Sequence, residues 1–284
     1  HPWRALAEHT GGVCQSEVGF AASFWEGRVV GVTGTNGKTS LTLLLRDAFQ
    51  QAGLEAHAVG NIGASFSDLV AKVGPGADAI AVCELSSFQA ELPSGLGLDA
   101  LLWTNFAEDH LDRYPDMAAY FAAKARLVSC LLPSAPFLVG EGVLESASIY
   151  GVPLEHPEVI QVESVIPEGL RLQSPFTGMP QAQNYGLAAA LFEDWSLAMN
   201  ALEQTANRFE LAAHRLQPCA RFGGVTFWND SKATNFHAVE AALLRMQAPV
   251  FWIGGGIAKG GDLAAFTQRI GPQIERAYVY GAVG

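Results

Sequence analysis

The sequence predicts an α/β protein with a central, mostly parallel sheet domain that carries a P-loop, followed by a partial Rossmann-like α/β domain. Short continuous apolar runs lie at residues 29–32, 79–83, 100–103 and 137–139, and helical patterns separate them. Strands buried on both faces of a parallel sheet have this composition. The first run leads into a glycine-bearing loop and then a helical pattern, which is the order of a phosphate-binding strand, loop and helix.

The loop between the first strand and the first helix reads Thr33-Gly34-Thr35-Asn36-Gly37-Lys38-Thr39. Its glycines let successive backbone N–H groups face a phosphate, and the helix start adds its positive dipole end. Lys38 would reach the β- and γ-phosphates of a nucleotide, and the Thr39 hydroxyl would hold Mg²⁺. Val32 stands where the common P-loop pattern has its first glycine, so a plain strand-to-helix turn that binds no ligand remains the alternative.

Composition limits the classes of protein. The 284 residues are 49% hydrophobic and 16% charged, which is typical of one large or two medium globular domains. A net charge of −11 argues against a nucleic-acid surface. No apolar run approaches the roughly 20 residues of a membrane span, so we expect a cytoplasmic protein. We also expect it to be a monomer. The four cysteines, at 14, 83, 130 and 219, are scattered, and we expect reduced and mostly buried thiols.

The chain divides into three predicted segments. Residues 1–27 are interpreted as a linker or the tail of a preceding domain, residues 28–211 as a nucleotide-binding domain, and residues 212–284 as a partial domain. Because the chain starts at His1 and stops just after an apolar run, both ends are expected to be cut. Helices are predicted at 40–52 and 116–131, and a further helix is opened by residues 178–184 and runs through Leu191, with edge strands and loops over 141–182. The last segment should hold strands at 225–228, 250–253 and 277–280, with helices at 235–246 and 263–274.

Ligands of parallel sheets bind beyond the carboxyl ends of the strands. Glu84 follows an apolar strand there, as the acidic magnesium partner of P-loop enzymes does. The alternative is a solvated carboxylate at a strand end. His110 lies among acids in a loop after the next strand, which would suit a divalent metal ion or simply a solvated loop.

Lys124 lies on the apolar stripe of the predicted helix over 116–131. A lysine there usually keeps its stem on the core and its ammonium in water. If the ammonium is buried instead, the neutral amine is favoured, and a neutral amine can react with carbon dioxide.

Residues 33–39 resemble the variant P-loop of the Mur ligase family, the ATP-dependent amide ligases of peptidoglycan synthesis. Further segments match motifs of that family in the same order, at residues 84–89, 109–112, 230–235 and 254–259. The resemblance covers about residues 28–284. The segments 84–89 and 230–235 resemble the signatures of those members that join D-glutamate to UDP-N-acetylmuramoyl-L-alanine.

The resemblance implies roles for individual residues. ATP would contact Gly34, Thr35, Asn36, Gly37, Lys38, Thr39, Asn184, Arg215 and Asp230, with Asn184 at the adenine, Asp230 at the ribose and Arg215 at the phosphates. Two Mg²⁺ ions are expected, one on Thr39 and Glu84, the other on His110 and a carbamylated Lys124. Asn61 would face the acyl substrate, and Lys232, Thr234 and Lys259 the incoming amino acid. The family usually has Gly-x-His-Asn-x-x-Asn near the adenine, and only Gly178 and Asn184 match it here.

The implied reaction transfers the ATP γ-phosphoryl group to the carboxylate of UDP-N-acetylmuramoyl-L-alanine, after which the amine of D-glutamate displaces phosphate. Lys38, His110 and Lys124 are the expected catalytic residues, since both steps accumulate negative charge. Three alternatives remain open: a sister ligase that adds another amino acid, a truncated or non-catalytic ATP-binding paralogue, and a P-loop ATPase that uses water.

Overall fold

The computed structural model describes residues 6–7, 9–12, 14–161, 167, 169–246, 249–256 and 261–282. The chain forms two compact units. The first contains His1–Phe106 and Tyr120–Phe209, and the second contains Ala107–Ala119 and Glu210–Gly284.

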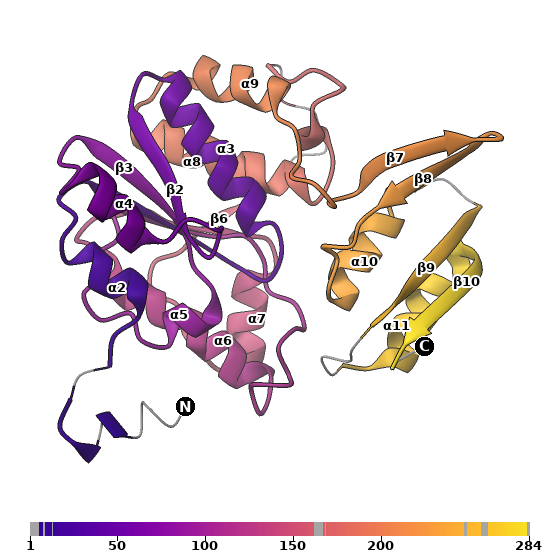
Figure 1. The fold of residues 1–284 in the computed structure, drawn as a ribbon, viewed down its shortest axis with the longest axis horizontal. Helices are drawn as coiled ribbons and strands as arrows, with labels where there is room; N and C mark the ends of the chain where they lie inside the picture. The colour runs from indigo at the N-terminus through magenta and orange to yellow at the C-terminus, as the bar shows by residue number, and fades with distance from the viewer. Residues whose placement is uncertain are drawn as a thin grey trace. The chain divides into compact units, whose positions relative to one another are not determined.

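The first unit is built on a six-stranded sheet with the strand order β2-β3-β1-β4-β5-β6 (Figure 1). All five pairings are parallel, which confirms the predicted α/β class with a central parallel sheet. The strands are β1 (Arg28–Thr33), β2 (Glu55–Gly60), β3 (Ala79–Glu84), β4 (Ala100–Trp103), β5 (Phe137–Gly140) and β6 (Glu158–Ile160). β1, β3, β4 and β5 match the apolar runs because their side chains are buried on both faces.

Helices cover both faces of this sheet (Figure 1). One apolar cluster joins the sheet to α3 (Lys38–Gln51), α8 (Gln181–Asp194) and α9 (Met199–Arg208). The other joins it to α2 (Glu17–Ala22), α4 (Phe66–Val73), α5 (Ser87–Ala90), α6 (Met117–Ala125) and α7 (Val143–Tyr150). The Phe49 and Phe192 rings stack at 5.4 Å in the first cluster, and Trp103 packs at 4.8 Å from Phe121 in the second. The two layers hold the sheet rigidly and leave its strand ends for loops.

The structure corrects the prediction of loops and edge strands over residues 141–182. Part of this segment is the helix α7, whose buried Val143 and Ala147 are spaced one turn apart. Gly142 and Gly151, both left-handed, bound the helix. Glycines at both ends of only eight residues resemble loop composition, so the sequence pattern does not indicate this helix. The predicted edge strand within the segment is present as β6.

One further helix boundary differs from the prediction. The helix predicted at 116–131 ends as α6 at Ala125 and continues as a 3-10 turn over Arg126–Cys130. α2 contributes the fully buried Val18 to the core of the first unit, and the Trp25 indole N–H donates to the Arg28 carbonyl at 3.3 Å. α2 is therefore packed onto the sheet domain.

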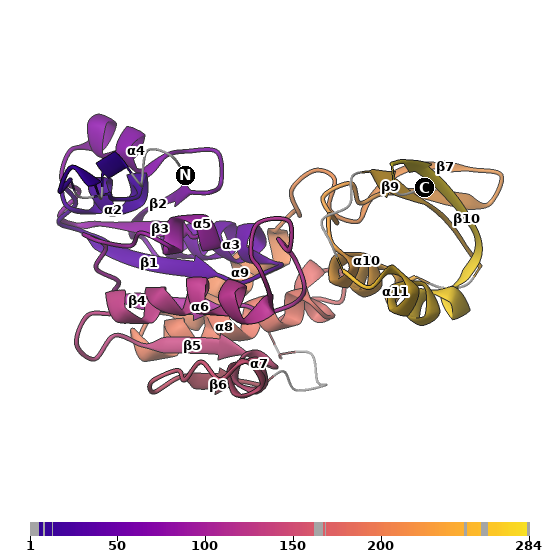
Figure 2. The same ribbon diagram turned by 90° about the horizontal axis from the view of Figure 1, so that it is seen from below.

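The second unit contains a parallel strand–helix–strand unit, β9 (Val250–Gly256), α11 (Leu263–Ile270) and β10 (Ile274–Gly281). α10 (Phe236–Leu243) packs on α11 through Phe236 and Phe266, whose rings stack at 4.3 Å. β8 (Val225–Asn229) pairs antiparallel with β7 (Gln217–Phe222), a strand that the sequence patterns did not indicate. Figure 2 shows both strand pairs from a second direction.

Two expectations from composition can be checked directly. No helix among the described residues is long and apolar enough to cross a membrane. All four cysteines are free thiols, as predicted, but only Cys83 and Cys130 are buried.

Candidate nucleotide and metal site

The loop after β1 bends through two glycines with positive φ. Gly34 has φ 138° and Gly37 has φ 83°, and Gly37 is the N-cap of α3. A Cβ atom on Gly34 would collide with the Thr104 hydroxyl, so this position accepts only glycine without a shift of its neighbours. The loop thus opens directly onto the helix N-terminus, where backbone N–H groups favour an anion.

Asn105, just after β4, clamps this loop. Its carbonyl accepts from the Thr35 amide at 3.1 Å, and its side-chain amide pairs with the Asn36 backbone, at 2.9 Å to the nitrogen and 3.1 Å to the oxygen. The Thr104 hydroxyl donates to the Asn36 carbonyl at 2.7 Å. Both residues follow a buried strand that proves to be the neighbour of β1.

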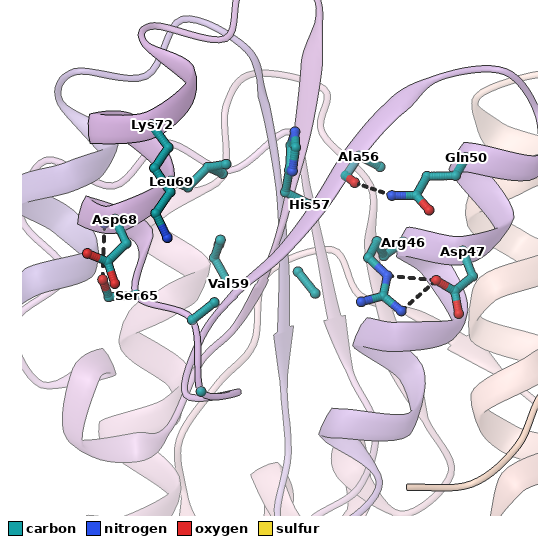
Figure 3. Close-up of a pocket in the computed structure, with 13 residues that line it drawn as sticks. Arg46, Asp47, Gln50, Ala56, His57, Val59, Ser65, Asp68, Leu69 and Lys72 are labelled. Carbon is teal, nitrogen blue, oxygen red and sulfur yellow. Dashed lines mark hydrogen bonds and ion pairs between the residues drawn. The ribbon is translucent and has the colours of Figure 1, made fainter.

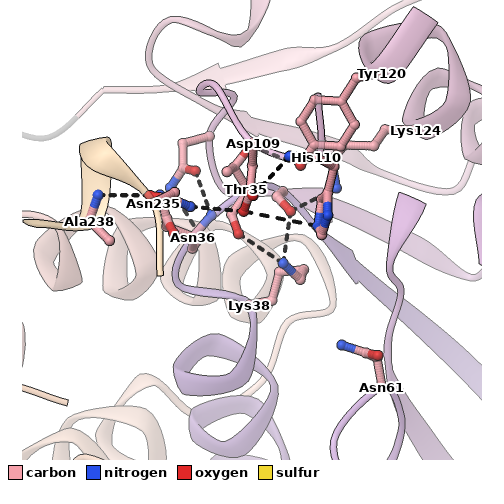
Figure 4. A network of polar contacts seen from close by, with 12 residues as sticks. Thr35, Asn36, Lys38, Asn61, Asp109, His110, Tyr120, Lys124, Asn235 and Ala238 are labelled. Carbon is pink, nitrogen blue, oxygen red and sulfur yellow. Dashed lines mark hydrogen bonds and ion pairs between the residues drawn. The ribbon is translucent and has the colours of Figure 1, made fainter. Parts of the chain in front are cut away.

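Two lysines converge on the same carbonyl of the loop (Figure 4). The Lys38 ammonium donates to the carbonyls of Gly34 and Thr35, both at 2.9 Å. The Lys124 ammonium, from α6, donates to the Gly34 carbonyl at 2.8 Å. The Lys124 side chain is only 1% exposed, so the structure buries it rather than letting it extend to water. This side of the loop therefore concentrates positive charge where phosphate oxygens would bind.

Tyr120 also contacts the loop from α6. Its hydroxyl lies 3.3 Å from the Thr35 hydroxyl. The Lys124 ammonium lies 5.0 Å from the centroid of the Tyr120 ring, within the range of a cation–π contact. α6 therefore supports the loop through two side chains one turn apart, of which the sequence indicated only Lys124.

Glu84 provides a candidate metal ligand. It ends β3 beside Val32 of β1 and is 2% exposed. Its Oε1 accepts from the Asn61 side-chain amide at 2.9 Å, whereas its buried Oε2 has no hydrogen-bond partner among the described residues. A buried carboxylate oxygen without a donor is costly unless a cation binds it. The pair of oxygens therefore fits a hard divalent cation such as Mg²⁺.

Asn184, expected at the adenine, lies against the loop. Its side chain is 2% exposed, and its amide nitrogen donates to the Gly37 carbonyl at 3.2 Å and to the Gln181 side-chain oxygen at 2.8 Å. A Cβ atom on Gly37 would lie 3.0 Å from that nitrogen. The geometry gives Asn184 a part in holding the loop, and its contact with adenine stays a prediction.

In the second unit, His110 lies in the segment Ala107–Ala119, ahead of the start of α6 at Met117. Its backbone is left-handed, with φ 58°. The buried Asp109 carboxylate accepts from the His110 amide at 2.9 Å and from the Asn235 side-chain amide at 3.0 Å (Figure 4). The His110 imidazole lies 3.9 Å from the same carboxylate.

Arg215 and Asp230 belong to a second arrangement in this unit. The Asp230 carboxylate accepts from the Leu216 amide at 2.8 Å, and burial raises the pKa of Asp230, opposed by that hydrogen bond and by Arg215. Leu216, with φ 45°, follows Arg215, and His214, with φ 66°, precedes it. Such strained residues require support from their surroundings and often occur at functional sites.

The predicted residues are distributed between the two units. The first unit brings the loop 34–39 together with Lys124 and Asn184, and it pairs Asn61 with Glu84. The second unit holds His110, Arg215 and Asp230, together with the exposed side chains of Lys232 and Thr234. Lys259 lies outside the described residues. A joint metal site of His110 and Lys124 stays a prediction. No group of three or more His, Cys, Asp or Glu side chains in the described part of the chain is placed to bind a metal ion.

A separate cavity of about 530 Å³ lies beside the edge strand β2, between α3 and α4 (Figure 3). None of the predicted site residues lines it. Two of its charged groups have close partners: Arg46 pairs with Asp47 at 2.6 Å, and His57 lies 2.9 Å from Glu55. We assign no ligand to it.

Residues 32–140 match the Mur ligase middle domain. The UDP-N-acetylmuramoylalanine–D-glutamate ligase of Dinoroseobacter shibae is 33% identical over 99% of this chain and 68% of that protein. The ligase of the same name from a Synechocystis species is 36% identical over 85% of this chain and 58% of that protein.

Solved structures share the fold. MurF from Acinetobacter baumannii matches 92% of this chain and 70% of that chain with a TM-score of 0.66 at 14% identity. A bifunctional folylpolyglutamate synthase/dihydrofolate synthase from Yersinia pestis matches 94% and 81% with a TM-score of 0.62 at 17% identity. At these identities the likeness shows the fold alone.

The sheet order, the loop after β1 and the acidic end of β3 define a P-loop α/β protein. Within that class, the identity to the Dinoroseobacter protein over nearly the whole chain determines the family. The chain belongs to the Mur ligase family, as its motifs predicted. It spans 68% of the length of the first of these relatives and 58% of the second.

Proposed function

We propose that this chain carries the catalytic machinery of an ATP-dependent amide ligase that adds D-glutamate to UDP-N-acetylmuramoyl-L-alanine in peptidoglycan precursor synthesis. The observation that carries the proposal is the loop 34–39 with two lysine ammonium groups on it, next to the strand whose end supplies the buried Glu84. The names of its relatives support the choice of substrates. Such a reaction belongs in the cytoplasm, where ATP is available.

The phosphates of ATP would replace contacts that the loop now makes internally. The Lys38 ammonium is held by two loop carbonyls, within a short side-chain movement of an anion at the start of α3. Asn105 and Asn184 hold the loop backbone so that its N–H groups keep their direction. In this proposal Arg215 contacts the phosphates and Asp230 the ribose.

Thr39 and Glu84 would hold one Mg²⁺ ion, and His110 with a carbamylated Lys124 a second. When bound, the ions would neutralise charge on the transferred phosphoryl group. Contacts within the first unit favour carbamylation of Lys124, because its ammonium and that of Lys38 both donate to the Gly34 carbonyl, at 2.8 Å and 2.9 Å. Two like charges so close, one of them buried, disfavour each other. Conversion of one amine to an anionic carbamate removes this repulsion.

The reaction balances as two substitutions. A carboxylate oxygen of UDP-N-acetylmuramoyl-L-alanine attacks the γ-phosphorus, the bond from that phosphorus to the bridging oxygen breaks, and ADP leaves. The D-glutamate amine then attacks the acyl carbon, phosphate leaves, and the ammonium proton passes to solvent or phosphate. Lys38 would compensate the charge of the first step, Asn61 would face the acyl group, and Lys232, Thr234 and Lys259 would orient the amino acid.

Phosphate release tests this proposal. The chain is incubated with ATP, Mg²⁺, UDP-N-acetylmuramoyl-L-alanine and D-glutamate, and each component is omitted in turn. Release that requires both acceptors supports the ligase, and release that requires neither indicates an ATPase. ATP binding without release indicates a non-catalytic nucleotide-binding module, and a different preferred amino acid indicates a sister ligase.

Two lysine variants sharpen this experiment. Lys38→Met should abolish phosphate release, whereas Lys72→Met, which changes an exposed lysine of α4, should leave it unchanged. Lys124→Ala should lose activity and regain part of it when a small carboxylate such as acetate is added, since the free carboxylate can occupy the place of the carbamate. Full activity in Lys124→Ala would exclude the carbamate.

A further inference from the structure

We propose that Asn235 is a positioning residue that acts through Asp109 to hold the backbone of His110 in its left-handed conformation. The proposal rests on the proposed function in one respect: His110 matters to catalysis only if it approaches the nucleotide phosphates. Asn235, Asp109 and His110 all lie within the second unit, so the hydrogen bonds that join them can be tested without substrate.

Asn235 uses both ends of its side-chain amide. Its oxygen accepts from the Ala238 amide at 2.9 Å and so caps the N-terminus of α10. Its nitrogen donates to Asp109 at 3.0 Å (Figure 4). Serine, threonine and aspartate cap helices too, but none of them offers an amide donor on the far side of the cap. Asparagine at this position therefore makes a hydrogen bond to Asp109 that the other capping residues cannot make.

Asp109 joins Asn235 to the backbone of His110 by hydrogen bonds. One carboxylate oxygen accepts from the His110 amide at 2.9 Å and the other from Asn235. The His110 carbonyl accepts from the amides of Arg113 and Tyr114 at 3.0 Å and 2.9 Å. A non-glycine residue with φ 58° persists only where its surroundings hold it, and here bonds on both sides of His110 do so.

Along the sequence, the hydrogen bonds from Asn235 through Asp109 to His110 lie next to residues assigned to the amino-acid substrate and to the phosphate loop. Asn235 directly follows Thr234, which we assign to the amino-acid substrate. The segment Ala107–Ala119 begins two residues after Asn105 and ends directly before Tyr120, and both of these residues contact the phosphate loop in the first unit. An amino acid bound near Thr234 would thus bias the conformation of His110 through the side chains of Asn235 and Asp109.

Asn235→Asp separates capping from positioning. Aspartate caps a helix as well as asparagine does, so α10 should keep its start. It cannot donate to Asp109, and it places a second carboxylate beside the first. Combination with Asp109→Asn restores a donor and acceptor pair with the direction reversed, and the new amide oxygen can still accept from the His110 amide.

Hydrogen exchange of the 284-residue chain without nucleotide is the test. In Asn235→Asp the amides of residues 110–114 should exchange about tenfold faster, which corresponds to the loss of one hydrogen bond to a charged acceptor. The amides of α10 should exchange as in the wild type, and the double variant should restore slow exchange at 110–114. Unchanged exchange at 110–114, equal loosening of α10, or failure of the double variant would each overturn the proposal.

A second readout tests the consequence for catalysis. If the ligase is active, Asn235→Asp should raise the Mg²⁺ concentration needed for half-maximal phosphate release, and the double variant should lower it again. An unchanged Mg²⁺ requirement alongside faster exchange would remove the catalytic role. If the wild-type chain releases no phosphate at all, the proposed function fails, whereas the exchange pattern still decides whether Asn235 positions His110.

Discussion

Gly34→Ala should lower the stability of the protein by more than the cost of placing a side chain in this backbone conformation. A residue with a side chain at φ 138° costs about 1–3 kcal/mol. The new Cβ atom would also collide with the buried Thr104 hydroxyl and lie 3.2 Å from the Asn105 backbone nitrogen and oxygen. Displacement of that hydroxyl breaks its bond to the Asn36 carbonyl, a further loss of about 1–3 kcal/mol. We therefore expect a total loss of about 2–6 kcal/mol.

Gly53→Ala is the matched control. Gly53 has φ 84°, and a Cβ atom there meets nothing within 4 Å, so only the backbone cost of about 1–2 kcal/mol applies. Urea unfolding of both variants can be followed by tryptophan fluorescence. One of the six tryptophans, Trp103, is buried in β4, and its indole N–H donates to the Asn105 carbonyl at 3.1 Å. ATP affinity is measured by calorimetry on the same samples.

Gly34→Ala should be the less stable of the two variants and should bind ATP weakly, whereas Gly53→Ala should bind it normally. Adding Thr104→Ala to Gly34→Ala removes the colliding hydroxyl, so the pair should be less destabilised than the sum of the single changes. Equal losses of stability in the two glycine variants, or wild-type ATP affinity in Gly34→Ala, would refute this account of the loop.

Three further predictions follow from single contacts. Asn61→Ala removes the donor to Glu84 and should weaken Mg²⁺ binding about 10–100-fold, measured as Mg²⁺-dependent thermal stabilisation; an unchanged titration would exclude this support. Asn184→Ala removes the donor to the Gly37 carbonyl and should cost about 1–3 kcal/mol in urea unfolding, together with ATP affinity; a stable variant that loses only ATP affinity would favour direct adenine contact. Burial raises the pKa of Tyr185 to about 12 from 10, so its contribution to stability is present below pH 10 and is lost as pH rises toward 12. Tyr185→Phe should lack this alkaline loss, and parallel pH curves for the two proteins would contradict it.

The short apolar runs predicted the buried strands because both faces of such strands must be apolar. Residues 100–103 coincide with β4, and 79–83 with all but the last residue of β3. α7 escaped detection because its eight residues bury only Val143 and Ala147 and lie between glycines. β7 escaped because its side chains are exposed, so no apolar periodicity marks it.

The sequence by itself determined the class of fold, the family and the identity of the loop, because these depend on residues that are neighbours along the chain. It also placed Lys124 on the buried stripe of its helix. Only the tertiary structure decided the partners of the loop: Asn184 meets Gly37 across 147 positions of sequence, and Lys124 meets Gly34 across 90. Such contacts depend on strand order and layer packing, which bring distant side chains together and leave no periodic signal in the chain.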